Sequence, residues 1–173
     1  MSKIGPATAA LLLLLASSVK LAVAADASVG VPQTLLDGVL AKFGNGDIVT
    51  KSDVRQARLL KLVEPAADSD QAYVDAIIDR RLMLSDLKRN PPAEPAPEAI
   101  ESRYQEWVAR LGGAATVPDL FRRAGMTEAG LRGWIRDDLR LQTYLDQRFG
   151  TASDRRAAMA TWVSMLRQRA GVR

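Results

Sequence analysis

The sequence contains neither cysteine nor histidine, and each absence limits what the protein can do. Without cysteine the fold has no disulfide and no cysteine-linked lipid, so a packed core must stabilise it. Without cysteine or histidine, nucleophilic catalysis of the usual kinds lacks its thiolate or its base. The Gly-x-Gly of Gly44-Asn45-Gly46 has no third glycine and no Lys-Ser, so it indicates a turn and not a phosphate-binding loop. We expect no enzymatic activity, no cofactor and no bound metal.

The charge balance argues against a second class of protein. Lys and Arg number 24 and Asp and Glu 20, a net charge of +4. So small an excess is not the electrostatic signature of a nucleic-acid-binding protein. The charge is uneven, because residues 148–173 hold six arginines and one acid, Asp154. This run predicts a solvated helix face, with an acidic partner or an anionic membrane surface as the alternative.

The first 25 residues have the features of a secretory signal peptide. Lys3 gives a positive start, Ala7 to Val19 form an uncharged run, and Ala22 to Ala25 offer small residues for cleavage. The run is shorter than the roughly 20 apolar residues that span a bilayer. Lys20 is unusual so close to the apolar run, and an uncleaved, weakly anchored N-terminus is the alternative. We expect a signal peptide over residues 1–25, export to the periplasm, and no stable membrane insertion after cleavage.

The remaining chain is long enough for one domain with a core of its own and too short for two. We expect a flexible segment over residues 26–37 and a single domain over residues 38–173. Asn45-Gly46 predicts a type I′ turn at the start of this domain, because this dipeptide tolerates positive φ at both central positions. Thr50 stands where a helix N-cap is expected, with Asp53 completing a weaker form of the capping box. The apolar residues that suit the two short strands are Leu40, Phe43, Ile48 and Val49.

Apolar residues at helical spacing, with caps and breakers between them, predict six helices after the hairpin. Pro65 ends the first helix, and the prolines from Pro91 to Pro97 form a stiff connector before the third. The second helix is apolar over two adjoining faces, which predicts the central and most buried element. The predicted ranges are 50–63, 69–89, 97–111, 116–124, 127–149, and a last helix from 153 or 154 onward. The sequence therefore predicts a mainly α, compact helical domain with a short N-terminal β-hairpin.

Three stretches, in this order, resemble the N-terminal domain of SurA-type periplasmic chaperones and the related regions of parvulin-type foldases. They are the hairpin and helix start Asn45–Val54, the long helix Val74–Leu84, and the phrase Leu120–Arg136. The match extends over residues 38–149, and the signal peptide agrees with it. The resemblance implies a periplasmic chaperone core. It also implies that the last segment, Ala157–Arg167, is a returning helix that packs on the N-terminal helices.

The chain departs from this family at one junction. In SurA-type proteins, parvulin isomerase domains lie between the N-terminal helices and the returning helix. Here the long helix ends at Phe149-Gly150 and the last helix starts at Ser153 or Asp154. No room remains for an isomerase domain, and parvulin active sites rely on histidine. We therefore expect the chaperone core without peptidyl-prolyl isomerase activity.

Aromatic and methionine side chains are the candidates for a client-binding groove. By default such side chains on a helix belong to the core. Methionine is flexible, however, and suits a surface that accepts many sequences. The two interpretations stay open for Trp107, Phe121, Met126, Trp134, Met159, Trp162 and Met165. Asp75, Asp79 and Asp86 are interpreted as ion-pair partners of the arginines on their own helix, and not as catalytic or metal-binding groups.

Together these features predict an ATP-independent holding chaperone for unfolded or extended polypeptides, such as outer-membrane protein precursors. The alternative is a dedicated, non-enzymatic assembly or structural subunit of an envelope or polysaccharide-export system. A diverged enzyme or a basic nucleic-acid-binding protein is a weaker alternative. The expected partners are client polypeptides and no nucleic acid, and a homodimer is compatible with the sequence.

Overall fold

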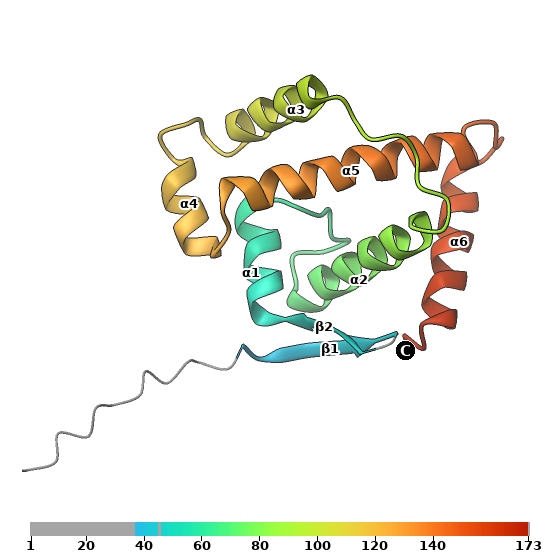
Figure 1. Cartoon of the computed structure of the whole chain (residues 1–173). Helices are drawn as coiled ribbons and strands as arrows, with labels where there is room; N and C mark the ends of the chain where they lie inside the picture. Colours follow the sequence, from blue (N-terminus) through green and yellow to red (C-terminus); the bar gives the residue numbers. More distant parts are fainter. Residues whose placement is uncertain (1–36, 45, 173) are drawn as a thin grey trace, which may run out of the picture. The chain divides into compact units, whose positions relative to one another are not determined.

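In the computed structural model, which describes residues 37–44 and 46–172, one antiparallel hairpin precedes six helices (Figure 1). The elements are β1 (Val39–Phe43), β2 (Asp47–Thr50), α1 (Lys51–Leu60), α2 (Asp70–Leu87), α3 (Pro97–Arg110), α4 (Val117–Ala124), α5 (Glu128–Phe149) and α6 (Arg155–Arg169). The predicted mainly α fold with a short hairpin is confirmed. The predicted signal peptide, and the predicted flexible segment except for Asp37, lie outside the described residues.

The hairpin forms where the sequence predicts it, but its turn differs from the expected two-residue turn at Asn45-Gly46. The register pairs Phe43 with Asp47, so three residues connect the strands. The Gly46 N–H donates a hydrogen bond to the carbonyl oxygen of Phe43, with an N···O distance of 3.3 Å. Gly44 and Gly46 have φ of 54° and 103°, in the region that favours glycine. These two glycines permit a connection one residue longer than predicted.

Only one face of the hairpin packs on the helices. Phe43 and Val49 are buried there, as expected for strand residues that contact a core. Leu40 and Ile48 lie on the other side and are 39% and 41% exposed. The register shifts between Val39 and Ala41, so a β-bulge distorts β1 near Leu40. The four predicted strand residues therefore divide equally between the core and the surface.

The two ends of α1 show how local chemistry sets its length. The Oγ1 atom of Thr50 accepts the Asp53 N–H at 3.2 Å, and the Thr50 N–H donates to an Asp53 carboxylate oxygen at 2.9 Å. This is the predicted capping box. The helix ends at Leu60, earlier than predicted, because Lys61 adopts a left-handed φ of 49°. The reversal places Leu62 in the core.

Buried side chains form two clusters. The larger cluster joins the hairpin to α1–α5 and includes Leu131 and Ile135, which are fully buried. The smaller cluster joins the C-terminal halves of α2 and α5 to α6 and includes Leu87 and Trp162. Leu82 of α2 packs against both clusters. In the part of the chain that the structure describes, no helix is long and apolar enough to cross a bilayer.

Helix α2 has the predicted central place, since it contacts α1, α5, α6 and both strands. It is not the most buried element, because α5 contains six buried residues and α2 only four. Both helices belong to both core clusters, but one side of α2 bears Asp75 and Asp79, which form ion pairs with Arg167 of α6.

Helix α6 packs back on the N-terminal elements, as predicted (Figure 1). Arg167 forms ion pairs with Asp75, at 2.9 Å, and with Asp79. These two acids therefore bind an arginine of α6, and the prediction that they pair with arginines of their own helix was wrong. At the end of α6, the Gly44 N–H donates to the Ala170 carbonyl oxygen at 2.9 Å. The last helix is thus joined to α2 and to the hairpin loop.

Candidate functional site

A cleft of about 620 Å³ opens between the segment after α1 and helices α2, α3 and α5. Figure 1 shows α5 running between α3 and α2, so that side chains of α5 can meet side chains from both neighbours. We call this hollow the α2–α3–α5 cleft. The residues that give it its chemical character are Arg80, Arg103, Trp107, Arg110, Trp134 and Asp138.

Two indole rings form one wall of the cleft. Trp107 of α3 and Trp134 of α5 meet edge to face, with ring centroids 5.1 Å apart and planes at 67°. Trp107 is 5% exposed and its indole N–H donates to the carbonyl oxygen of Leu60 at 2.7 Å. Trp134 is only half-buried. Trp107 therefore fixes the wall, while part of Trp134 faces the cleft.

A guanidinium group lies over each indole. The Arg80 guanidinium carbon is 4.0 Å from the centre of the Trp134 ring, and that of Arg110 is 4.1 Å from the centre of the Trp107 ring. Such contacts are attractive because the ring face is electronegative. Among the described residues, no carboxylate oxygen lies within 4.0 Å of the side-chain nitrogens of either arginine. Arg110 is exposed, so its donors are open to a ligand.

Burial dominates the electrostatics at the back of the cleft. It lowers the pKa of Arg80, although Asp138 and Asp137 act in the opposite direction. The group stays charged, since arginine ionises far above neutral pH. Its Nη2 donates to the Trp134 carbonyl oxygen at 3.1 Å, whereas its buried Nε has no hydrogen-bond partner among the described residues. Burial also raises the pKa of Asp138, against the pull of Arg80, Arg103 and Arg110.

The cleft combines aromatic and apolar surface with four basic and four acidic side chains, and the arginines are the groups that lie over the indoles. Such a lining can contact apolar side chains and donate to main-chain carbonyl groups of an extended peptide. In the described part of the chain, no group of three or more acidic side chains is arranged to hold a metal ion.

The structure brings together some of the seven predicted groove residues. Trp107 and Trp134 line the α2–α3–α5 cleft. Met126 and Trp134 both line a smaller adjoining cavity of about 140 Å³. Phe121 of α4 is half-buried against the larger core cluster. All four residues belong to the larger core cluster or pack against it.

The other three predicted residues lie on α6. Trp162 and Met159 pack in the smaller core cluster. Trp162 and Met165 line a separate pocket between α2, α5 and α6, and Met165 is 41% exposed. The predicted residues are therefore distributed over two regions.

Of the residues that give the cleft its chemical character, the sequence analysis did not select Arg80, Arg103, Arg110 and Asp138. A signal for Arg80 existed, since it falls at helical spacing from Tyr73, Ile77 and Leu84, on an otherwise apolar face. A charged side chain on an otherwise apolar helix face indicates that it either pairs with a group across an interface or lines a cleft. Asp138 gives the same signal, since it falls at helical spacing from Trp134, Leu141 and Leu145.

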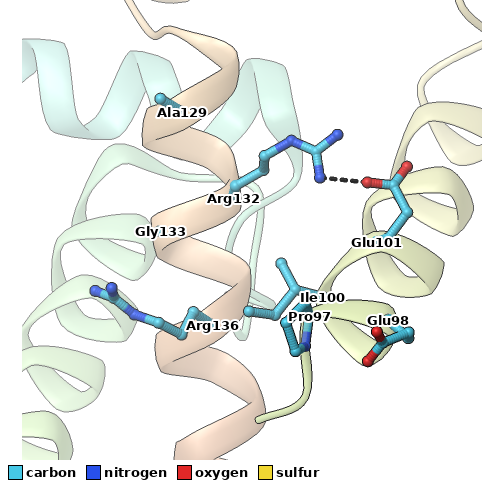
Figure 2. A pocket seen from close by; sticks show the side chains of 8 residues that line it. All are labelled: Pro97, Glu98, Ile100, Glu101, Ala129, Arg132, Gly133 and Arg136. Carbon is cyan, nitrogen blue, oxygen red and sulfur yellow. Dashed lines mark hydrogen bonds and ion pairs between the residues drawn. The ribbon is translucent and has the colours of Figure 1, made fainter. Parts of the chain in front are cut away.

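A second hollow, of about 660 Å³, lies between α3 and α5, where Figure 2 shows Arg132 and Glu101 pointing toward one another. Arg132 binds Glu101 at 2.5 Å and Glu128 at 3.0 Å, and its guanidinium lies 4.0 Å above the ring of Tyr104. The hydrogen bond from Arg132 is the main reason why the pKa of Glu101 is lowered. Because Arg132 already has two acidic partners, this hollow offers a ligand less than the cleft does.

Comparisons of the chain with protein-family models, with curated proteins and with solved structures give no match. The resemblance to SurA-type domains therefore stays a prediction, based on the three stretches of sequence described above.

Proposed function

We propose that the protein is a periplasmic, ATP-independent holding chaperone that binds unfolded or extended polypeptides in the α2–α3–α5 cleft. The observation that carries the proposal is the wall of the cleft, where Trp107 and Trp134 are each covered by a guanidinium group without an acidic partner among the described residues. The resemblance to SurA-type chaperone domains supports the same function.

An unfolded chain presents apolar side chains and main-chain carbonyl groups that a folded protein hides. The exposed part of Trp134 and the side chain of Met83 supply apolar contacts, and flexible methionine adapts to different clients. Arg110 and Arg103 at the rim donate to carbonyl groups and keep the complex hydrated. A protein that binds the unfolded state in this way lowers its free concentration and delays aggregation.

Aggregation assays test the proposal. The purified protein is mixed at near-stoichiometric ratio with an outer-membrane protein diluted from urea, and light scattering is followed. We expect delayed and reduced scattering without ATP, and a similar effect on an unrelated denatured enzyme. The absence of protection at every ratio would contradict the proposal. A pull-down that yields one stoichiometric partner, with no general protection, would favour a dedicated assembly or structural subunit.

A further inference from the structure

The pocket lined by Trp162 and Met165, of about 460 Å³, lies where the end of α2 meets α5 and α6. None of its lining residues lines the α2–α3–α5 cleft. The pocket takes Arg148 and Arg169 from the arginine-rich C-terminal run of the sequence and adds Arg89 from the segment after α2. Its apolar surface comes from Tyr144, Trp162 and Met165.

The single acid of the pocket, Asp86, is already occupied by protein donors. One of its carboxylate oxygens accepts the Tyr144 hydroxyl at 3.2 Å and the Trp162 indole N–H at 3.3 Å. The other oxygen lies 3.6 Å from a guanidinium nitrogen of Arg89. Burial and the nearby Asp86 raise the pKa of Tyr144, so its hydroxyl stays a donor at neutral pH. Asp86 therefore orients the aromatic wall and has little capacity left for the other arginines.

Arg148 and Arg169 consequently carry charge that is not neutralised locally. Arg148 donates to the Tyr144 hydroxyl oxygen at 3.1 Å, and its guanidinium carbon lies 5.3 Å from the centre of the Trp162 ring. Among residues 37–44 and 46–172, neither arginine has a carboxylate oxygen within 4.0 Å. With one acid and three arginines, the pocket has an excess of positive charge beside the exposed side chain of Met165, while Tyr144 and Trp162 contribute mostly buried rings to its wall.

We propose that this pocket binds an organic carboxylate attached to an aromatic or apolar group. The carboxylate lies between Arg148 and Arg169, because guanidinium groups pair well with carboxylates. The attached group packs on Met165, whose side chain is otherwise left exposed to water, and on the small part of Trp162 that lines the pocket. A small aromatic acid and the C-terminal residue of a polypeptide both present this chemistry. The site does not depend on the proposed chaperone function.

Four probes test the site by NMR titration of the purified, isotope-labelled protein, with the assigned indole N–H signal of Trp162 as the readout. The probes are N-acetylphenylalanine, its C-terminal amide, 3-phenylpropionate and inorganic phosphate. We expect N-acetylphenylalanine to shift the signal saturably and to bind at least about tenfold more tightly than the amide or phosphate. Equal binding of 3-phenylpropionate supports a small aromatic acid as ligand, and a preference for N-acetylphenylalanine supports a polypeptide C-terminus.

Matched variants locate the binding. Arg169→Gln is expected to weaken the binding of N-acetylphenylalanine at least about fivefold, since one of the two cationic groups is lost. Arg156→Gln, at an exposed position of the same helix outside the pocket, is expected to leave it unchanged. Arg148→Gln, which removes the guanidinium group on α5, is also expected to weaken the binding of N-acetylphenylalanine. Equal affinity for the acid and the amide, or equal losses in Arg169→Gln and Arg156→Gln, would overturn the proposal.

Discussion

The indole N–H of Trp107 donates a buried hydrogen bond, 2.7 Å long, to the carbonyl oxygen of Leu60. Leu60 is the last residue of α1, where main-chain carbonyl groups lose their helical partners. Trp107 stands near the end of α3, and it lies 47 residues from Leu60 in the sequence. One hydrogen bond therefore satisfies a carbonyl group at the end of α1 and joins α1 to α3. This contact also holds the aromatic wall of the cleft in place.

Trp107→Phe should therefore destabilise the protein. The Leu60 carbonyl is left buried without a partner, which costs about 1 to 3 kcal/mol, and the smaller ring adds a cavity. Trp134→Phe is the matched control, because the Trp134 indole N–H has no hydrogen bond to any described residue. Urea denaturation followed by circular dichroism should give a smaller free-energy loss for the control. Equal losses would show that the hydrogen bond to Leu60 contributes nothing specific.

Two glycines should respond in opposite directions to alanine. Gly133 lies within α5 and an added Cβ would meet no atom within 4 Å, so Gly133→Ala should stabilise the protein by about 0.5 to 1 kcal/mol. Gly125 ends α4 with φ of 66°, so Gly125→Ala should cost about 1 to 2 kcal/mol. Thermal unfolding measures both changes. A stabilising Gly125→Ala would mean that α4 does not end in the left-handed conformation.

Leu166→Ala should measure how strongly α6 supports the domain. Leu166 is 7% exposed in the smaller core cluster, and its truncation should cost about 2 to 5 kcal/mol. Gln168→Ala, on the exposed side of the same helix, should change the free energy of unfolding by no more than about 0.5 kcal/mol. A Leu166→Ala variant with an unchanged urea midpoint would indicate that α6 is a free arm in solution.

The contribution of Asp138 to the free energy of unfolding should depend on pH. Because burial raises its pKa in the folded state, the folded protein holds this proton more tightly than the unfolded chain does. The contribution of Asp138 to stability therefore falls as pH rises above the unfolded pKa of about 3.9 and through the folded value.

Asp138→Asn mimics the protonated form at every pH. The variant should be more stable than the original protein at pH 7, and this advantage should shrink as the pH is lowered toward 4. Urea denaturation across this range, with both proteins in the same buffers, gives the difference directly and cancels the titration of the other groups. An advantage that stays constant with pH would mean that the carboxylate is not desolvated.

The local features of the fold could be predicted because short segments determine them. The capping box of Thr50 and Asp53 and the start of α3 at Pro97 depend on neighbouring residues only. The longer hairpin loop was missed because Gly44 also adopts positive φ, so that the sequence permits a connection of either two or three residues. The pairing of Arg167 with Asp75 was also missed, since it joins residues 92 apart and requires the packing of α6 on α2.

Part of the candidate site could also be predicted, from the spacing of apolar residues along the helices. Trp107 and Trp134 stand on apolar helix faces, so their meeting at an interface follows from helical spacing. The division of the other aromatic residues between two regions depends on how the helices cross, which the spacing does not specify. Arg80 was overlooked because a single charge on an apolar stripe resembles an ordinary solvated residue until its neighbours are known.

The most direct test of the proposed chaperone function is to block the α2–α3–α5 cleft and to measure the binding of an unfolded polypeptide. Ala76 of α2 lines the cleft, and Ala99 of α3 is exposed outside it. The binding of a fluorescently labelled, permanently unfolded polypeptide is measured by anisotropy for the original protein, Ala76→Gln and Ala99→Gln. We expect Ala76→Gln to weaken binding at least about fivefold and Ala99→Gln to leave it unchanged. Unaltered binding by Ala76→Gln, or no binding by the original protein, would contradict the account.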